Sequence, residues 1–246
     1  MEKHIYKLKK QETDERDYKL TSILDVYSAV KLPKSVDLRS KCPPIYDQFT
    51  IGSCTANAGV AARVMLNNLT TQLSRLDLYY DERVIENDVN QDGGAQMRDI
   101  GNALVKYGVC EESYFPYDIT KFTNAPSVQA NANALKYKIK SYYSVLTIAD
   151  IKNVLALKQQ PVLVGIDVYE SFESDVVAKT GIVPLPKKTE KLLGGHAVLS
   201  VGFDDKKKYF IMRNSWGSDW GDKGYFYLPY TYFTKKFAYD FWVLQN

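Results

Sequence analysis

An apolar stretch that follows Ser53 constrains the fold of this chain more than any other feature. Alanine, valine, leucine and methionine fill most positions from 56 to 69, and no proline interrupts them. A helix formed by this stretch is apolar on nearly every face, so it must lie inside a domain. The sequence therefore predicts a central, buried helix that begins at Gly52 or Ser53.

The segments around this helix change character along the chain. Prolines precede it, which predicts extended or turning backbone over 33–50. Helices are predicted at 76–89, 97–107 and 149–157. Alternating or continuous apolar runs predict strands at 137–143, 161–168, 196–203, 208–213 and 224–228. Helices in the first half and strands in the second predict an α+β fold with two lobes.

The composition excludes several classes of protein. Of the 246 residues, 45% are hydrophobic and 25% are charged, which is typical of a globular protein. The net charge of +3 is dispersed, so nucleic acid is not an expected partner. No window reaches the length of a membrane span, and the first ten residues lack the apolar part of a signal peptide. Three cysteines cannot form a disulfide framework. An intracellular or virion-associated monomer is expected.

Chemistry near neutral pH must depend on one of two histidines. His4 lies in a polar tail, where a rigid site is not expected. His196 follows two glycines and opens a predicted strand. A histidine in such a place is more often structural than functional, so its meaning depends on its partners.

Cys54 stands at the predicted start of the buried helix. Free N–H groups and the positive end of the helix dipole favour a thiolate there, and a thiolate is the attacking form of cysteine. An inert core cysteine is the alternative, but Gly52 and Ser53 leave room for a substrate. Gln48 precedes Cys54 by six positions and could donate to an oxyanion together with the Cys54 amide.

Asn214 and Trp216 follow a predicted strand. An asparagine oxygen can accept from one ring nitrogen of His196 and thereby orient the ring. Trp216 could cover that hydrogen bond and exclude water from it. A tryptophan-rich turn without a catalytic role is the alternative.

Three segments in this order resemble the papain-like cysteine peptidases. Residues 47–54 resemble the active-site loop of that family, 195–198 its histidine strand and 213–217 its asparagine motif. The resemblance implies a papain-like peptidase domain over 33–246. It implies a helical left lobe, mainly 45–130, and a β-barrel right lobe, mainly 131–235, with the cleft between them.

The resemblance also implies roles for individual residues. Cys54 would be the nucleophile, His196 its acid–base partner, Asn214 the residue that orients the histidine and Gln48 the oxyanion donor. The substrate would lie against the residues of the cleft wall, which are Gly93, Gly94, Gly165, Gly195 and Trp216. Gly93 and Gly94 would pair their backbone with an extended peptide. The specificity pocket is predicted to be roomy and uncharged, with walls at Gly165, Gly194, Ala95 and Gln96.

Two positions depart from the plant and lysosomal pattern. Ile51 stands where the family signature has a cysteine, and Thr55 stands where it has an aromatic residue. The chain therefore resembles the bacterial and viral members more. The usual disulfide through position 51 cannot form, and pairing of Cys42 with Cys110 is left open.

Residues 1–32 are too short for the usual helical propeptide and are predicted to form a plug or belt on the cleft or the right lobe. An endopeptidase is the expected function. An exopeptidase or amide hydrolase of the same fold and a catalytically silent peptide-binding module are the alternatives. The cysteines and histidines lack metal-ligand spacing, so a metal site is not expected. No cofactor is implied, because thiolate and imidazole supply the nucleophile and the acid–base chemistry.

Overall fold

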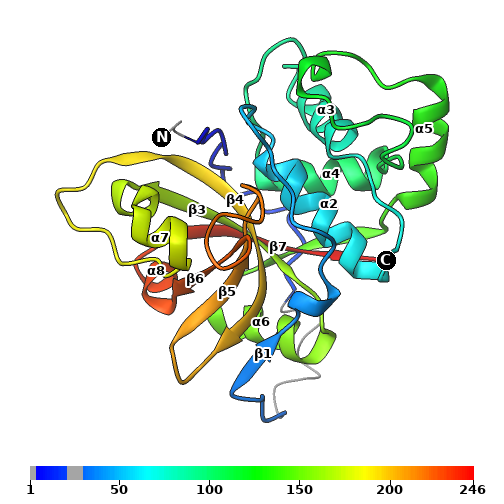
Figure 1. The fold of residues 1–246 in the computed structure, drawn as a ribbon. Coiled ribbons are helices and arrows are strands. Elements are labelled where there is room, and N and C mark those ends of the chain that lie inside the picture. Colours follow the sequence, from blue (N-terminus) through cyan, green and yellow to red (C-terminus); the bar gives the residue numbers. More distant parts are fainter. Residues whose placement is uncertain (1–3, 21–29) are drawn as a thin grey trace.

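The computed structural model describes residues 4–20 and 30–246 of the chain. Figure 1 shows a helical lobe beside a lobe built on an antiparallel sheet, with α2 between them. The helices are α2 (Cys54–Asn67), α3 (Arg75–Ile85), α4 (Met97–Lys106), α5 (Val128–Ala134), α6 (Ile148–Asn153), α7 (Asp175–Thr180) and α8 (Tyr230–Thr234). The strands are β1 (Ser35–Asp37), β2 (Ser141–Val145), β3 (Val162–Tyr169), β4 (Leu192–Asp204), β5 (Tyr209–Arg213), β6 (Tyr225–Pro229) and β7 (Ala238–Gln245). The prediction of an α+β fold is confirmed.

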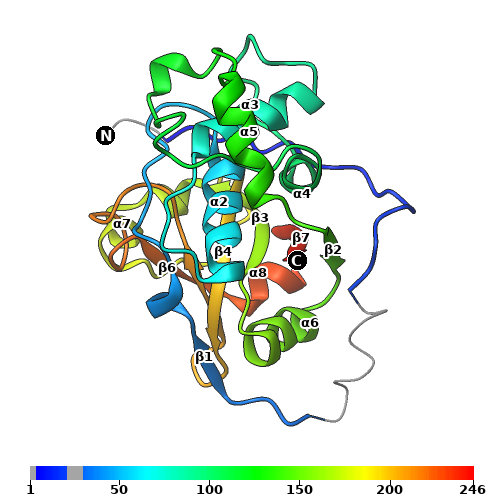
Figure 2. The same cartoon turned by 90° about the vertical axis from the view of Figure 1, so that its right-hand side faces the viewer.

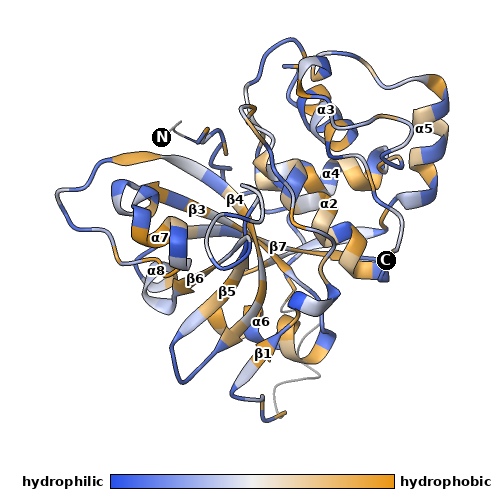
Figure 3. Cartoon of the chain, viewed as in Figure 1, coloured by the Kyte–Doolittle hydropathy of each residue, from blue (hydrophilic) through white to orange (hydrophobic). Residues whose placement is uncertain are grey.

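Helix α2 is the buried helix that the apolar stretch predicts. All of its residues from Cys54 to Met65 are buried. Gly59 permits the close approach of its neighbours, since a Cβ there would lie 2.6 Å from Ile100 of α4 and 2.9 Å from Leu78 of α3. The helix ends where Asn68 takes a left-handed conformation with φ of 50°. The helix packs on α3 and α4 on one side and on β4 on the other, so it lies at the boundary between the lobes. In Figure 3, hydrophobic colour follows the helix and the strands.

The strands form one sheet in the order β2-β7-β3-β4-β5-β6, with β1 paired to β4. Among the described residues no pairing joins β2 to β6, so the sheet curves without closing by hydrogen bonds. Strand β7 was not predicted, although it pairs with both β2 and β3. Its sequence carries Asp240 with φ of 52°, which breaks the alternation expected of a strand.

Several predicted boundaries were wrong by a few residues. The helix predicted at 76–89 ends at Ile85, because the chain turns through a left-handed Asn87 into a loop. The helix predicted at 149–157 is α6 followed by a π-helical turn, Val154–Lys158. None of the helices in the described residues is long and apolar enough to cross a bilayer.

Residues 4–20, here called the strap, run along the surface between the lobes. Figure 2 shows this segment in dark blue, passing from the N label across the molecule to its opposite side. The strap ends on the edge strand β2, where the Ser144 amide donates to the Tyr18 carbonyl at 2.8 Å and the Leu20 amide donates to the Ser144 carbonyl at 2.9 Å. Leu20 is buried, with 1% of its surface exposed. This contact fixes the far end of the strap.

Candidate active site

Cys54 is the first residue of α2, as predicted, and lies where the helix meets β4. The N-cap residue Ser53 makes no side-chain capping bond, so the first N–H groups of the helix stay available. Helix α2 packs against β4, the strand that carries His196. This contact brings Cys54 beside the histidine strand.

The hydrogen bonds of Asn214 define the tautomer of His196. The Ser215 amide donates to Asn214 Oδ1 at 2.9 Å, which identifies this atom as the oxygen of the side chain. His196 Nε2 lies 2.8 Å from the same oxygen and must therefore be the donor. The other ring nitrogen, Nδ1, is buried and has no partner among the described residues. It carries the lone pair that could accept the thiol proton of Cys54.

Trp216 covers this arrangement as the sequence suggests. Its ring stacks on His196 with a centroid distance of 4.9 Å and an interplanar angle of 23°. Phe172 and Trp220 pack edge-on against the tryptophan ring, so the cover is itself held in place. The His196–Asn214 hydrogen bond is therefore shielded from water.

Gln48 is buried and is held by both lobes. Its Nε2 donates to the Ile51 carbonyl at 3.1 Å, and its Oε1 accepts from Ser215 Oγ at 2.8 Å. An amide NH₂ has two N–H bonds, so one remains free for another acceptor. These contacts orient the side chain in the loop that leads into Cys54.

Burial keeps Cys54 and His196 neutral in this structure. Burial raises the pKa of the Cys54 thiol to about 12. Burial also lowers the pKa of His196 to about 4, although its bond to Asn214 acts in the opposite direction. At pH 7 the pair is thus thiol and imidazole, not thiolate and imidazolium.

The strap covers the glycines predicted to line the cleft. A Cβ at Gly94 would lie 1.9 Å from the Lys7 carbonyl oxygen, and one at Gly52 would lie 2.8 Å from Lys7 Cβ. The Lys9 amide donates to the Ala95 carbonyl at 3.0 Å. The left wall of the predicted cleft is therefore occupied by residues of the same chain.

The right wall is occupied by the same segment. The Leu8 amide donates to the Gly195 carbonyl at 3.1 Å. The Leu8 side chain is 7% exposed and reaches within 3.0 Å of the point where a Cβ at Gly165 would lie. Tyr239 borders the same space, at 2.9 Å from that point. Leu8 thus fills the space beside Gly165 and Gly195 that was predicted to be roomy.

The prediction that His4 lies outside any rigid site was wrong. Its ring stacks on the free face of Trp216 at 3.7 Å, and its Nδ1 lies 3.1 Å from Glu173. Tyr6 follows, with its ring edge-on to His196 at 6.1 Å and its hydroxyl bonded to Glu173. Only the tertiary fold brings Glu173, 169 positions away from His4, to the strap.

Thr55, the departure from the aromatic residue of the signature, has a specific partner. Its hydroxyl donates to Glu82 Oε2 of α3 at 2.6 Å. Burial raises the pKa of Glu82 well above its usual value. The pair joins α2 to α3 one residue after the thiol. Sequence reasoning missed Glu82 because a charged residue in an amphipathic helix is expected to be solvent-exposed.

Arg83 was also missed, and it holds the loop that carries Gly93 and Gly94. We call residues 86–96 the cleft loop. The buried guanidinium of Arg83 donates to the Val89 carbonyl at 2.8 Å and to the Gln91 carbonyl at 3.1 Å, and it also bonds Tyr79 and Phe122 carbonyls. These backbone acceptors explain why a cation is buried at this position.

Substituting Arg83 by methionine should lower the free energy of unfolding by about 3 kcal/mol, because four backbone carbonyls lose the donor that the buried guanidinium supplies. Urea unfolding followed by circular dichroism measures the change. Arg16→Met is the matched control, since the Arg16 side chain is 90% exposed. Equal stability of the two variants would contradict a structural role for the Arg83 contacts.

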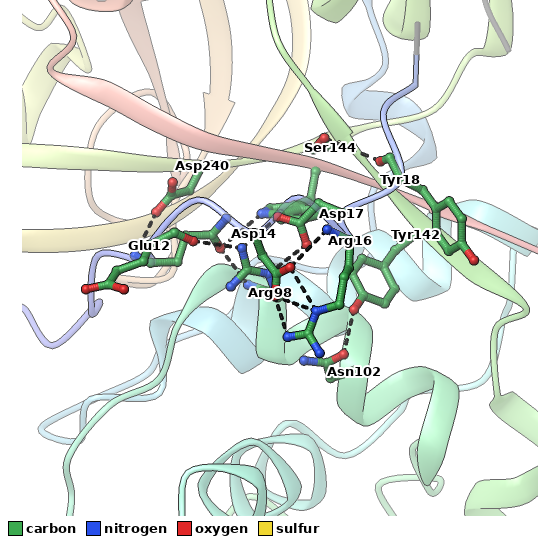
Figure 4. A network of polar contacts seen from close by, with 12 residues as sticks. Glu12, Asp14, Arg16, Asp17, Tyr18, Arg98, Asn102, Tyr142, Ser144 and Asp240 are labelled. Carbon is green, nitrogen blue, oxygen red and sulfur yellow. Dashed lines mark hydrogen bonds and ion pairs between the residues drawn. The ribbon is translucent and has the colours of Figure 1, made fainter. Parts of the chain in front are cut away.

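A second arginine holds the middle of the strap, as Figure 4 shows. Arg98 of α4 donates from Nε and Nη2 to the two Asp17 oxygens at 2.9 and 2.6 Å, and from Nη2 to the Glu12 carbonyl at 2.9 Å. The Gln11 amide donates to Asp240 Oδ2 of β7 at 3.3 Å. The strap is thus attached to both lobes.

All three cysteines are free, so Cys42 and Cys110 do not pair. In the described part of the chain, no group of three or more histidine, cysteine or acidic residues is placed to hold a metal ion.

Comparison with known proteins identifies the family. The family model for papain family cysteine proteases matches residues 32–235. The chain belongs to this family. The structure of xylellain, a cysteine protease from Xylella fastidiosa, is 38% identical, with a TM-score of 0.86 over 98% of this chain and 96% of that chain. The papain-like fold is therefore confirmed.

Relatives of the papain family from other sources extend the comparison. An uncharacterized peptidase C1-like protein of Acanthamoeba polyphaga mimivirus is 41% identical over 242 residues, which cover 92% of this chain and 75% of that protein. Cysteine proteinase 1 of Entamoeba histolytica is 31% identical and matches 81% of this chain. The chain spans 64% of the length of that proteinase. The predicted likeness to bacterial and viral members is confirmed.

Proposed function

We propose that the chain is an endopeptidase in which Cys54 attacks the peptide carbonyl and His196 moves the proton. The observation that carries the proposal is the tautomer of His196. Because Nε2 donates to Asn214 at 2.8 Å, the unpartnered Nδ1 is the acceptor for a thiol proton. The imidazolium formed would then protonate the leaving amine, and water would hydrolyse the acyl-enzyme.

Two donors would stabilise the tetrahedral intermediate in this mechanism. One is the Cys54 amide at the N-terminus of α2, and the other is the free N–H of Gln48. Asn214 is a positioning residue, since it would hold the ring of His196 through the proton transfer. Trp216 would exclude water from this bond.

The path of the strap favours cleavage within a chain over removal of a terminal residue. The strap runs without a break from His4, at Trp216, to Lys9, which pairs with Gln96 on the other side of Gly52. An extended peptide could therefore continue in both directions from Cys54. A cleft closed at one end, as an exopeptidase needs, would not hold the strap in this way.

We further propose that the strap is an internal inhibitor. It covers Gly94, Gly165 and Gly195, and a substrate would need the same surface. Burial under the strap also favours the neutral forms of Cys54 and His196.

The test is labelling by a peptidyl epoxide that reacts with activated thiols, with the adduct located by mass spectrometry. A single adduct on Cys54, which is absent in Cys54→Ala and much slower to form in His196→Ala, is expected once the strap has been displaced. Cys42 and Cys110 are internal controls, because they are free but lie outside the site. Absence of an adduct in a chain with a displaced strap would favour a catalytically silent binding module.

A further inference from the structure

The strap places one lysine on each side of Leu8, Lys7 before it and Lys9 after it, beside the glycines of the cleft. Lys7 Nζ is 2.7 Å from Asp92 Oδ2 and also bonds the Asp92 carbonyl. Lys9 Nζ bonds Glu86 Oε2 and lies 3.8 Å from Asp88 Oδ2. All three acids belong to the cleft loop. The space predicted to be uncharged is therefore flanked by a negatively charged wall.

Each of the two closest carboxylates has one oxygen fixed by the protein and one directed at the strap. Asp92 Oδ1 accepts from the Gly52 amide at 2.8 Å and from Tyr79 Oη at 2.5 Å, which leaves Oδ2 for Lys7. Glu86 Oε1 accepts from the Gln96 amide at 3.1 Å, which leaves Oε2 for Lys9. The inner hydrogen bonds orient the outer oxygens before any cation arrives, and such preorganisation lowers the entropic cost of binding.

We propose that the cleft selects peptides with a basic side chain on each side of an aliphatic one. The basic residue beside Gly52 would precede the scissile bond, and the second basic residue would lie two positions further from it. Asp92 and Glu86 are the specificity-determining residues, with Asp88 supporting Glu86. The inference rests on the proposed function, because it names the substrate class of that active site.

The order of charged and apolar side chains that the cleft selects is the same for either direction of the substrate. The sequence Lys7-Leu8-Lys9 reads the same from either end. Leu8 stands between the two lysines in the sequence, and it fills the apolar space beside Gly165 at 7% exposure. A peptide of either direction would therefore meet charge, apolar space and charge in that order.

The test uses a full-length variant in which the strap cannot return. Lys7→Glu and Lys9→Glu set like charges against Asp92 and Glu86, and Leu8→Asp sets a carboxylate against an apolar space. In this open variant, kcat/KM is measured for acyl-Lys-Leu-Lys and acyl-Gln-Leu-Gln peptides carrying the same fluorogenic amide. The lysine peptide should be cleaved about 25-fold better, at about fivefold for each ion pair, and the ratio should fall in high salt.

Asp92→Asn and Glu86→Gln, added singly to the open variant, should each lower that ratio about fivefold. Both substitutions keep the inner oxygen that accepts from Gly52 or Gln96, so the cleft loop retains its hydrogen bonds. Asp175→Asn is the matched control, since it removes one exposed negative charge on α7 and should leave the ratio unchanged.

A binding measurement separates failure of this inference from failure of the proposed function. The open variant also carrying Cys54→Ala is titrated with acetyl-Lys-Leu-Lys-amide and acetyl-Gln-Leu-Gln-amide by calorimetry. Tighter binding of the lysine peptide without any hydrolysis by the Cys54 form would support the inference and overturn the proposed function. Equal binding of the two peptides, or binding of neither, would overturn the inference and leave the acids as anchors of the strap alone.

Discussion

Replacing His196 by alanine is expected to lower kcat/KM for peptide hydrolysis by about 10⁴-fold in a chain whose strap is displaced. The imidazole would both accept the thiol proton and donate it to the leaving amine, so its loss removes two steps of the mechanism. Among the described residues, the other histidine is His4, which belongs to the strap and leaves with it. Steady-state hydrolysis of a fluorogenic peptide measures the effect.

Asn214→Ala separates the loss of the imidazole from the loss of its orientation. It removes the acceptor of the His196 Nε2 proton at 2.8 Å but keeps the imidazole. The expected loss is about tenfold to 100-fold, the cost of one orienting hydrogen bond. Both variants should unfold near the temperature of the parent chain, which circular dichroism checks. Activity of His196→Ala within tenfold of the parent would rule out its role in proton transfer.

Substituting Leu8 by aspartate is expected to raise peptide hydrolysis by the full-length chain about 100-fold. A carboxylate at this position would be buried beside Gly165 without a partner. Its burial would raise the free energy of the closed form by roughly several kcal/mol. The closed form of the strap would become the minor population, and activity rises with the open fraction. Thr13→Asp is the matched control, because it adds the same charge at an exposed position of the strap.

The pH dependence of thiol alkylation tests the same prediction without a substrate. With the strap closed, the pKa of Cys54 is about 12, so the thiolate fraction at pH 7 is about 10⁻⁵. Because the thiol pKa lies above the working range, alkylation of the parent chain should rise about tenfold per pH unit from pH 6 to 10. In Leu8→Asp the rate should level off near neutral pH, because solvation lets the imidazolium and thiolate form. Identical profiles for the two chains would show that the strap does not control the thiol.

The residues proposed to react were accessible from local sequence. A buried helix is visible as an apolar run, and the free N–H groups at its start favour a thiolate at Cys54. His196 and Asn214 stand in or just after predicted strands, so their approach to each other needs only the pairing of neighbouring strands β4 and β5. These features depend on residue type and short-range periodicity, which a sequence displays directly.

The position of the strap and its contacts could not be predicted from local sequence. Lys7, Leu8 and Lys9 look like part of a polar tail, because nothing nearby in the sequence gives them a surface to pack on. Their position depends on contacts with Glu86, Asp92 and Gly195, which are 77 or more positions distant. Contacts across such separations are decided by how the lobes pack.

By itself, then, the sequence determined the α+β class, the buried helix and the residues able to carry out thiol chemistry. The tertiary structure decided that β7 lies between β2 and β3, that Arg83 holds the cleft loop and that Cys54 is a buried, neutral thiol. The physical reason is that burial sets these properties. Burial is the sum of contacts from distant segments, and it changes the pKa of a thiol or the cost of a charge without changing any residue.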